Sequence, residues 1–166
     1  MKTLLILRHA KSSWKDASLS DNERPLNKRG IRSAQLIGKF IARRKLAPEV
    51  VLSSPAARAR ETAEIVVDVA KLNVVVHYDE RLYLASSRTL MEVIAQVEDQ
   101  FAQVLVVGHN SGMEDLVGVL TGQESHMPTA ALARVRIEVE SWREVRARTG
   151  FLEGIIRPRD ITAESL

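Results

Sequence analysis

The chain has 166 residues, of which 45% are hydrophobic and 27% are charged, and its formal net charge is +3. These values are typical of a globular protein, and the length predicts a single domain, residues 1–166, around one substantial core. The absence of cysteine excludes disulfides, thiol catalysis and thiolate metal sites, and an aromatic content of 4% argues against a stacking platform for single-stranded nucleic acid.

The first predicted element is a strand at residues 4–7. Four uninterrupted aliphatic residues are typical of a strand that is buried on both faces, as in a parallel sheet. The run stops at Arg8 and His9, so this polar pair lies at the carboxyl end of the strand, where ligands bind in open α/β sheets. The polar segment that follows, residues 12–26, is predicted to be a loop whose side chains, among them Arg24, can reach the same place.

Strands and helices alternate along the rest of the chain. Apolar periodicity and turn residues predict helices over residues 28–45, 55–70, 89–97 and 111–120, and strands over residues 49–53, 73–77, 103–108, 130–139 and 151–156. The tail from residue 158 is predicted to be irregular. This alternation indicates an α/β fold, a three-layer sandwich in which helices flank a mostly parallel central sheet.

Two further predicted strands also end in polar residues. Arg58 lies in the first turn of the helix after the second strand, and His109 follows the fourth strand. Because the carboxyl ends of parallel strands meet at one edge of a sheet, these two residues can converge with Arg8 and His9, and Arg24 can join them from the loop. A guanidinium binds a phosphoryl group through paired hydrogen bonds, and a neutral imidazole can attack phosphorus. The sequence therefore predicts a site for phosphoryl chemistry.

Three segments resemble the signature blocks of the histidine phosphatase (phosphoglycerate-mutase-like) superfamily. They are residues 7–10 (LRHA), residues 53–63 (SSPAARARETA) and residues 107–110 (VGHN). The short chain and the loop at residues 20–26 (SDNERPL) make it most similar to the SixA-type phosphohistidine phosphatases. The resemblance extends from residue 2 to about residue 136 and implies a phosphoglycerate-mutase-like fold.

The resemblance also implies a mechanism and a set of residue roles. His9 is expected to be the nucleophile of a metal-independent hydrolase that needs no cofactor, and a phospho-His9 intermediate is expected. Arg8, Arg58 and His109 are expected to stabilise charge on the phosphoryl oxygens as the other catalytic residues. Arg24 and Asp21 are the candidate substrate-binding residues of the first loop.

One departure from the superfamily pattern bears on the substrate. Mutase-like relatives and many phosphomonoesterases carry a glutamate in a block of the form Arg-Leu-x-Glu, whereas residues 81–84 of this chain read RLYL, so Leu84 stands at the acid position. An alkoxide, whose parent acid has a pKa near water's ~15.7, needs a proton donor to leave, whereas imidazole, which titrates near ~6.5, needs little help. The pattern therefore favours the P–N bond of phosphohistidine in a protein. Asp21 and Glu80 are the remaining candidates for a general acid.

Two other functions are compatible with the sequence. One is a small-molecule phosphomonoesterase with an unrecognised general acid, and the other is a phospho-binding module without catalysis. The expected partner is a phosphorylated protein or a small phosphorylated substrate, and neither nucleic acid nor a membrane, because basic residues are spread out and no apolar stretch approaches ~20 residues. The first residues lack the cleavage site of a signal peptide, so a cytoplasmic location is the simplest expectation. Trp14 is a candidate for the substrate entrance, and His126 is expected at the surface.

Overall fold

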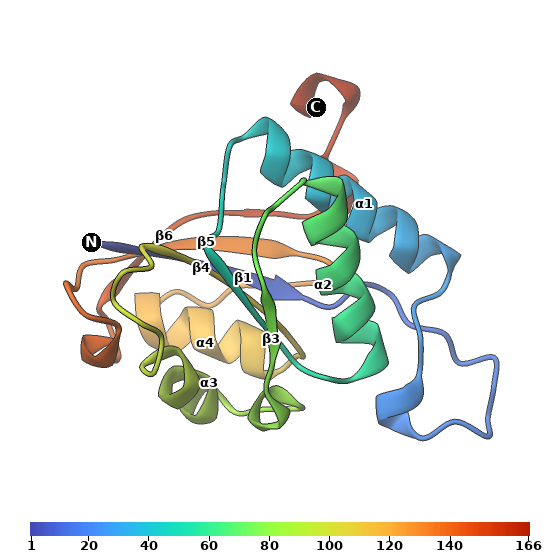
Figure 1. Cartoon of the computed structure of the whole chain (residues 1–166), viewed down its shortest axis with the longest axis horizontal. Coiled ribbons are helices and arrows are strands. Elements are labelled where there is room, and N and C mark those ends of the chain that lie inside the picture. The colour runs from blue at the N-terminus through green and yellow to red at the C-terminus, as the bar shows by residue number, and fades with distance from the viewer.

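The computed structural model describes residues 1–166 and consists of one six-stranded sheet with helices on both faces (Figure 1). The strand order is β3-β2-β4-β1-β5-β6. The strands are β1 (Lys2–Arg8), β2 (Val50–Ser53), β3 (Val76–Tyr78), β4 (Gln103–Gly108), β5 (Leu132–Ile137) and β6 (Gly150–Ile156). The helices are α1 (Lys28–Arg43), α2 (Ala57–Val69), α3 (Ser87–Ile94) and α4 (Gly112–Thr121). None of them combines the length and apolar character needed to cross a membrane.

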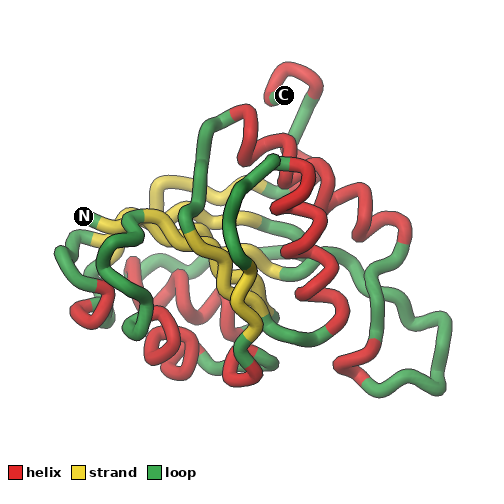
Figure 2. Tube along the Cα trace, in the orientation of Figure 1, coloured by secondary structure: helices red, strands yellow, loops and turns green.

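The sheet is mostly parallel, as predicted. Strands β3, β2, β4 and β1 run parallel to one another, whereas β5 pairs with β1 in the antiparallel direction and β6 pairs antiparallel with β5. The segment between β1 and α1 is mostly loop (Figure 2). The predicted three-layer α/β sandwich is therefore confirmed, with an antiparallel extension at one edge.

Strand β1 lies inside the sheet and is buried on both faces. Leu4 and Ile6 pack in the core under α3 and α4, whereas Leu5 and Leu7 pack in the core under α1 and α2, and all four side chains are 0% exposed. Full burial of each such side chain stabilises the fold by roughly 1.5–3 kcal/mol. The uninterrupted aliphatic run thus places the end of β1, and the residues that follow it, in the middle of the molecule.

The amino-terminal end and the buried face of helix α1 follow from its sequence. The Asn27 side chain accepts a hydrogen bond from the backbone amide of Gly30 at 2.8 Å and caps the helix. Ala34, Ile37 and Ile41 recur at helical spacing and are buried against the sheet.

Some boundaries differ from the sequence prediction for identifiable reasons. Helix α2 begins at Ala57 instead of residue 55, because the Ser54 hydroxyl accepts the amide hydrogen of Ala56 and holds the chain in a turn before the helix. Strand β3 covers residues 76–78 instead of 73–77, because it is an edge strand whose only partner is the short β2. The predicted irregular tail holds two short 3-10 turns, at Pro158–Asp160 and Ala163–Ser165.

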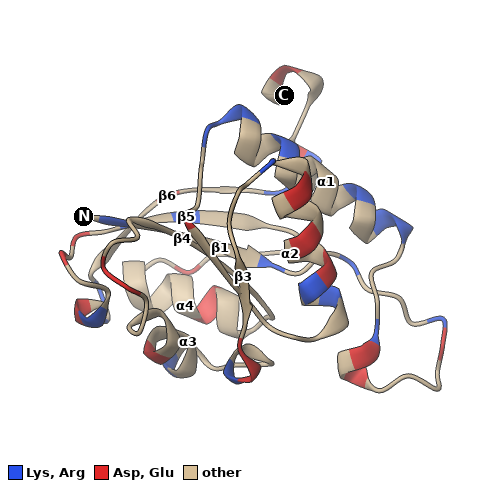
Figure 3. Cartoon of the chain, viewed as in Figure 1, with Lys and Arg blue, Asp and Glu red and all other residues tan.

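Lysine and arginine residues are distributed over several elements and loops (Figure 3), in line with their spread along the sequence. No single helix or terminal segment holds most of them.

A glycine in α1 allows the loop after His9 to pass close to the helix. A methyl group at Gly30 would overlap the backbone carbonyl oxygen of Lys11. Replacing Gly30 with alanine is therefore expected to lower the free energy of unfolding by about 1–3 kcal/mol, measured by urea denaturation.

The matched control is Gly118→Ala in α4. The nearest atom to the new methyl would be the carbonyl oxygen of Gln123 at 3.8 Å, which is an ordinary contact. This variant is expected to gain about 0.5–1 kcal/mol from helix propensity. A Gly30→Ala protein as stable as Gly118→Ala would contradict the close approach of α1 to Lys11.

Candidate active site

The predicted site residues meet at the carboxyl end of the parallel strands. His9 follows β1, His109 follows β4, Arg58 lies in the first turn of α2 and Arg24 comes from the first loop. Their exposed fractions are 7%, 2%, 4% and 8%, respectively. They line one cavity of about 290 Å³ together with Arg8, Lys11, Ser12, Trp14, Leu84, Asn110 and Thr129.

The geometry of His9 leaves one ring nitrogen free to attack. Its Nδ1 lies 2.7 Å from the carbonyl oxygen of Ala10, and since a carbonyl can only accept, Nδ1 carries the proton. Nε2 therefore holds a lone pair. Burial, with the charges of Arg58 and Arg8 as smaller causes, lowers the pKa of His9 to about 4, against the Ala10 hydrogen bond, which raises it. The ring is neutral at physiological pH, as a nucleophile must be.

His109 lies beside His9, with ring centroids 5.2 Å apart. Its Nε2 is 2.8 Å from the hydroxyl oxygen of Ser54, and its Nδ1 is buried without a hydrogen-bond partner. Tyr83 packs against the ring edge-on, at 5.5 Å between centroids. Burial lowers the pKa of His109 to about 3, with smaller contributions from His9 and Arg58. This imidazole is also neutral.

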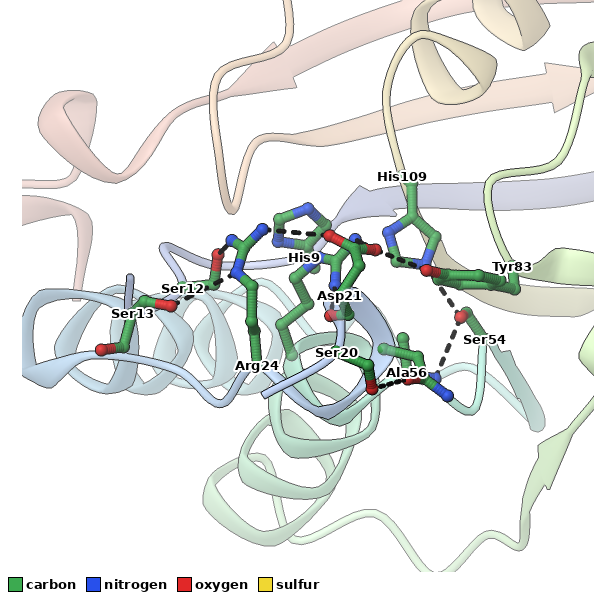
Figure 4. Close-up of polar contacts among 12 residues, drawn as sticks. His9, Ser12, Ser13, Ser20, Asp21, Arg24, Ser54, Ala56, Tyr83 and His109 are labelled. Carbon is green, nitrogen blue, oxygen red and sulfur yellow. Dashed lines mark hydrogen bonds and ion pairs between the residues drawn. The ribbon is translucent and has the colours of Figure 1, made fainter. Parts of the chain in front are cut away.

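Asp21 joins two arginines, Arg58 and Arg24, that come from different parts of the chain, and Figure 4 shows its contacts with Arg24 and Tyr83. Its Oδ2 accepts a hydrogen bond from Arg58 at 2.9 Å and its Oδ1 accepts one from Arg24 at 3.1 Å. The Tyr83 hydroxyl also donates to Oδ2. The hydrogen bond from Tyr83, and then those from Arg58, lower the pKa of the Asp21 carboxyl. An ionised carboxylate held in this way orients guanidinium groups and is a poor proton donor.

Arg24 is fixed on its other sides as well. It donates to the Ser12 hydroxyl and to the Ser13 carbonyl, and its guanidinium carbon lies 3.4 Å from the centre of the Trp14 ring. Trp14 is 76% exposed and lines the cavity, so it stands at the cavity mouth, and its role at a substrate entrance stays a prediction. Stacking on an aromatic face is a contact that the planar guanidinium makes well.

Arg8 is held by residues that the sequence interpretation missed. It donates to the carbonyl oxygen of Met127 at 3.1 Å, and the Met127 amide donates to Glu114 at 2.7 Å. The Asn110 side chain donates to both Glu114 and the Met127 carbonyl, each at 2.9 Å. Glu114 also raises the pKa of Arg8, although burial outweighs it and lowers the value. Asn110 belongs to the VGHN block, so the sequence alone could have identified it as a site residue. Glu114 could not be identified in this way, because acidic residues are common in the first turn of a helix.

The other candidates are placed as follows. Leu84 lines the cavity and is 56% exposed, so the position of the missing acid does face the site. Glu80 is exposed and is not among the residues that line it. The His126 side chain is 75% exposed and faces Glu114, in keeping with the expected surface position. No three His, Asp or Glu side chains lie close enough together to hold a metal ion.

Comparisons with known proteins agree with this geometry. Residues 4–83 match the model of the histidine phosphatase superfamily (branch 1). An uncharacterized protein of Mycobacterium tuberculosis is 34% identical over 165 residues, which cover 92% of this chain and 100% of the relative.

Two solved structures share both fold and sequence similarity with the chain. One, from Agrobacterium tumefaciens and carrying the name phosphohistidine phosphatase SixA, has a TM-score of 0.81 at 28% identity and covers 95% of this chain and 98% of its own. The protein histidine phosphatase SixA complexed with tungstate has a TM-score of 0.82 at 26% identity, with coverage of 96% and 99%. The chain therefore belongs to the histidine phosphatase superfamily, and within it to the SixA type.

Proposed function

We propose that the chain is a phosphatase that removes the phosphoryl group from phosphohistidine in a protein, through a covalent phospho-His9 intermediate. The observation that carries the proposal is the free Nε2 of His9, which belongs to a neutral ring in a cavity lined by three arginines. The Agrobacterium and tungstate-bound SixA structures, similar along almost the whole chain, support this substrate class.

In the proposed first step, Nε2 of His9 attacks phosphorus in line with the leaving nitrogen of the substrate. A P–N bond to Nε2 of His9 forms while the P–N bond of the substrate breaks, and the substrate ring, which carries a proton on its other nitrogen, departs as neutral imidazole. Water then attacks phospho-His9, releases phosphate and restores the neutral ring. Arg8, Arg58 and His109 stabilise charge on the phosphoryl oxygens in both steps, and Arg24 adds a contact.

Asp21 is proposed to keep Arg58 and Arg24 in position. Its carboxylate bonds to both side chains, so it fixes their separation before substrate arrives. Preorganised charges of this kind cost no reorganisation at the moment of reaction. The guanidinium groups supply the charge that a metal ion supplies in other phosphatases, so the reaction is proposed to need no metal.

The substrate preference follows from the proton donors near the leaving group. Leu84 stands where mutase-like relatives and many phosphomonoesterases carry an acid, and Asp21 is held as a carboxylate by Tyr83, Arg58 and Arg24. An imidazole leaving group needs little protonation, because it titrates near ~6.5, whereas an alkoxide needs an acid. The site is therefore suited to P–N bonds. The small cavity, with Trp14 exposed at its mouth, suits a phosphorylated side chain presented by a protein surface.

The first test is a paired assay with chelator present. One arm offers a phosphohistidine protein, and the other a set of alkyl phosphomonoesters and phosphosugars. Rapid loss of phosphohistidine is expected with negligible ester hydrolysis, and His9→Ala is expected to reduce the rate by on the order of 10⁴ or more. His77→Ala, on exposed β3, is the matched control and is expected to keep wild-type activity.

Three other outcomes of this assay would each contradict part of the proposal. Efficient ester turnover would indicate a small-molecule phosphatase with a general acid, and loss of activity in chelator would contradict the metal-free reaction. Phosphate binding without turnover in either arm would indicate a phospho-binding module.

The second test restores an acid at position 84. Leu84→Glu is expected to raise alkyl phosphomonoester turnover by about 10²-fold, because general acid catalysis typically contributes that much or more. Leu84→Gln is the matched control, since it has similar size and no ionisable group. Equal ester turnover in both variants would mean that the leaving-group acid is not what the site lacks.

The third test concerns pH. An unperturbed imidazole is about 90% protonated at pH 5.5. Burial lowers the pKa of His9 to about 4 and that of His109 to about 3, so both rings are expected to stay neutral down to about pH 5. Ring signals in NMR titrations, assigned with His9→Ala and His109→Gln, should therefore begin to move only as the pH approaches those values. A midpoint near ~6.5 for either ring would contradict its burial among arginines.

A further inference from the structure

Ser54 contacts His109, the second histidine of the site, without lining the cavity itself. It lies between β2 and α2, is 0% exposed, and places its hydroxyl oxygen 2.8 Å from Nε2 of His109 (Figure 4). A serine hydroxyl donates one hydrogen bond and accepts two. A buried hydroxyl is normally satisfied, so the direction of this hydrogen bond can be worked out from its surroundings.

The surroundings of Ser54 offer its hydroxyl proton a single hydrogen-bond acceptor. The amide of Ala56 donates to the hydroxyl oxygen at 3.2 Å, which uses one acceptor position. Apart from the Ala56 amide, which can only donate, the one hydrogen-bond partner of the hydroxyl is Nε2 of His109. If Nε2 carried a proton, the Ser54 proton would be buried without an acceptor, which is an unfavourable arrangement.

We infer that Ser54 donates to Nε2 of His109 and thereby fixes the proton of this neutral ring on Nδ1, where it serves as a hydrogen-bond donor to the phosphoryl oxygen. Ser54 is then a positioning residue, since it acts through His109 without touching the substrate. The inference rests on the proposed function for its catalytic consequence, but the position of the proton can be tested without it.

The surroundings of Nδ1 agree with this assignment. Nδ1 of His109 is buried and has no partner in the structure, and its ring lies 5.2 Å from that of His9. An unpaired donor beside the nucleophile is what an oxyanion site contains before the oxyanion arrives. In the opposite tautomer, a lone pair on Nδ1 would face the phosphoryl oxygens and repel them.

The tautomer is decisive only because the ring is neutral. A protonated imidazole has a donor on both nitrogens and would not need Ser54. Burial and the nearby positive groups lower the pKa of His109 to about 3, so a second proton is absent under physiological conditions. The site therefore gains a donor at this position through the direction of one hydrogen bond instead of through a positive charge.

The first experiment determines the tautomer in the wild-type protein. Nitrogen-15 NMR of histidine-labelled protein at neutral pH distinguishes a protonated ring nitrogen from an unprotonated one, and His109→Gln identifies the signals of His109. The expected result is a proton on Nδ1 and none on Nε2. A proton on Nε2 would overturn the inference, whether or not the protein turns over phosphohistidine.

The second experiment uses three variants. In Ser54→Ala, the His109 ring is no longer restricted to one tautomer, so Nε2 is expected to be protonated in part of the molecules. This variant is also expected to lower kcat by about 10–100-fold, with KM within about threefold of the wild-type value. Ser54→Thr keeps the hydroxyl and is expected to retain the Nδ1 proton and most of kcat. Ser53→Ala is the matched control: Ser53 is equally buried, but its hydroxyl bonds to the Ser54 carbonyl and not to His109.

The two readouts separate a positioning role from a packing role. If Ser54→Ala folds and its His109 still carries the proton on Nδ1 alone, the inference is overturned even if the rate falls. If Ser54→Ala does not fold, the tautomer in the wild-type protein decides the question.

Discussion

The register between β1 and β4 determines the geometry of the site. The two strands pair in parallel with Arg8 opposite Gly108, and the amide of His9 continues the ladder by donating to the Gly108 carbonyl at 2.9 Å. The next residues on the two strands are therefore His9 and His109, which lie side by side. A slip of one residue would turn every side chain of β1 to the other face of the sheet, so the buried aliphatic run that fixes the register also fixes the distance between the two rings.

The sequence predicted those parts of the site that depend on strand ends. The buried run before Arg8 and His9, and the similar run before His109, made convergence at one sheet edge predictable. The contacts that orient these residues could not be predicted in the same way. Ser54 meets His109 across 55 positions of sequence, and nothing in the local pattern of either residue indicates the contact. For the same reason, the edge strand β3 was misplaced: its bounds depend on the length of its partner β2.

Burial and positive charge act together on the two imidazoles. Either ring would be partly protonated in water near neutral pH, because free histidine titrates near ~6.5. Here desolvation is the largest cause of the lowered pKa of both His9 and His109, and the Arg58 guanidinium adds to it in each case. The arginines that we propose to bind the phosphoryl group therefore also help to keep the proposed nucleophile, His9, unprotonated. One arrangement meets two chemical requirements, which explains why these side chains are packed so closely.

This arrangement carries an electrostatic cost at α2, which the first loop offsets. Arg58 lies in the first turn of α2, where the helix dipole favours acidic residues, and that turn contains none. Asp21 provides the missing negative charge from a distant part of the chain, by bonding to Arg58 through both its carboxylate and its backbone carbonyl. The contact between Asp21 and Arg58 thus holds the first loop against α2. Docking of the loop and the placement of Arg58 are therefore coupled, and a substitution at either end of this contact is expected to act on both.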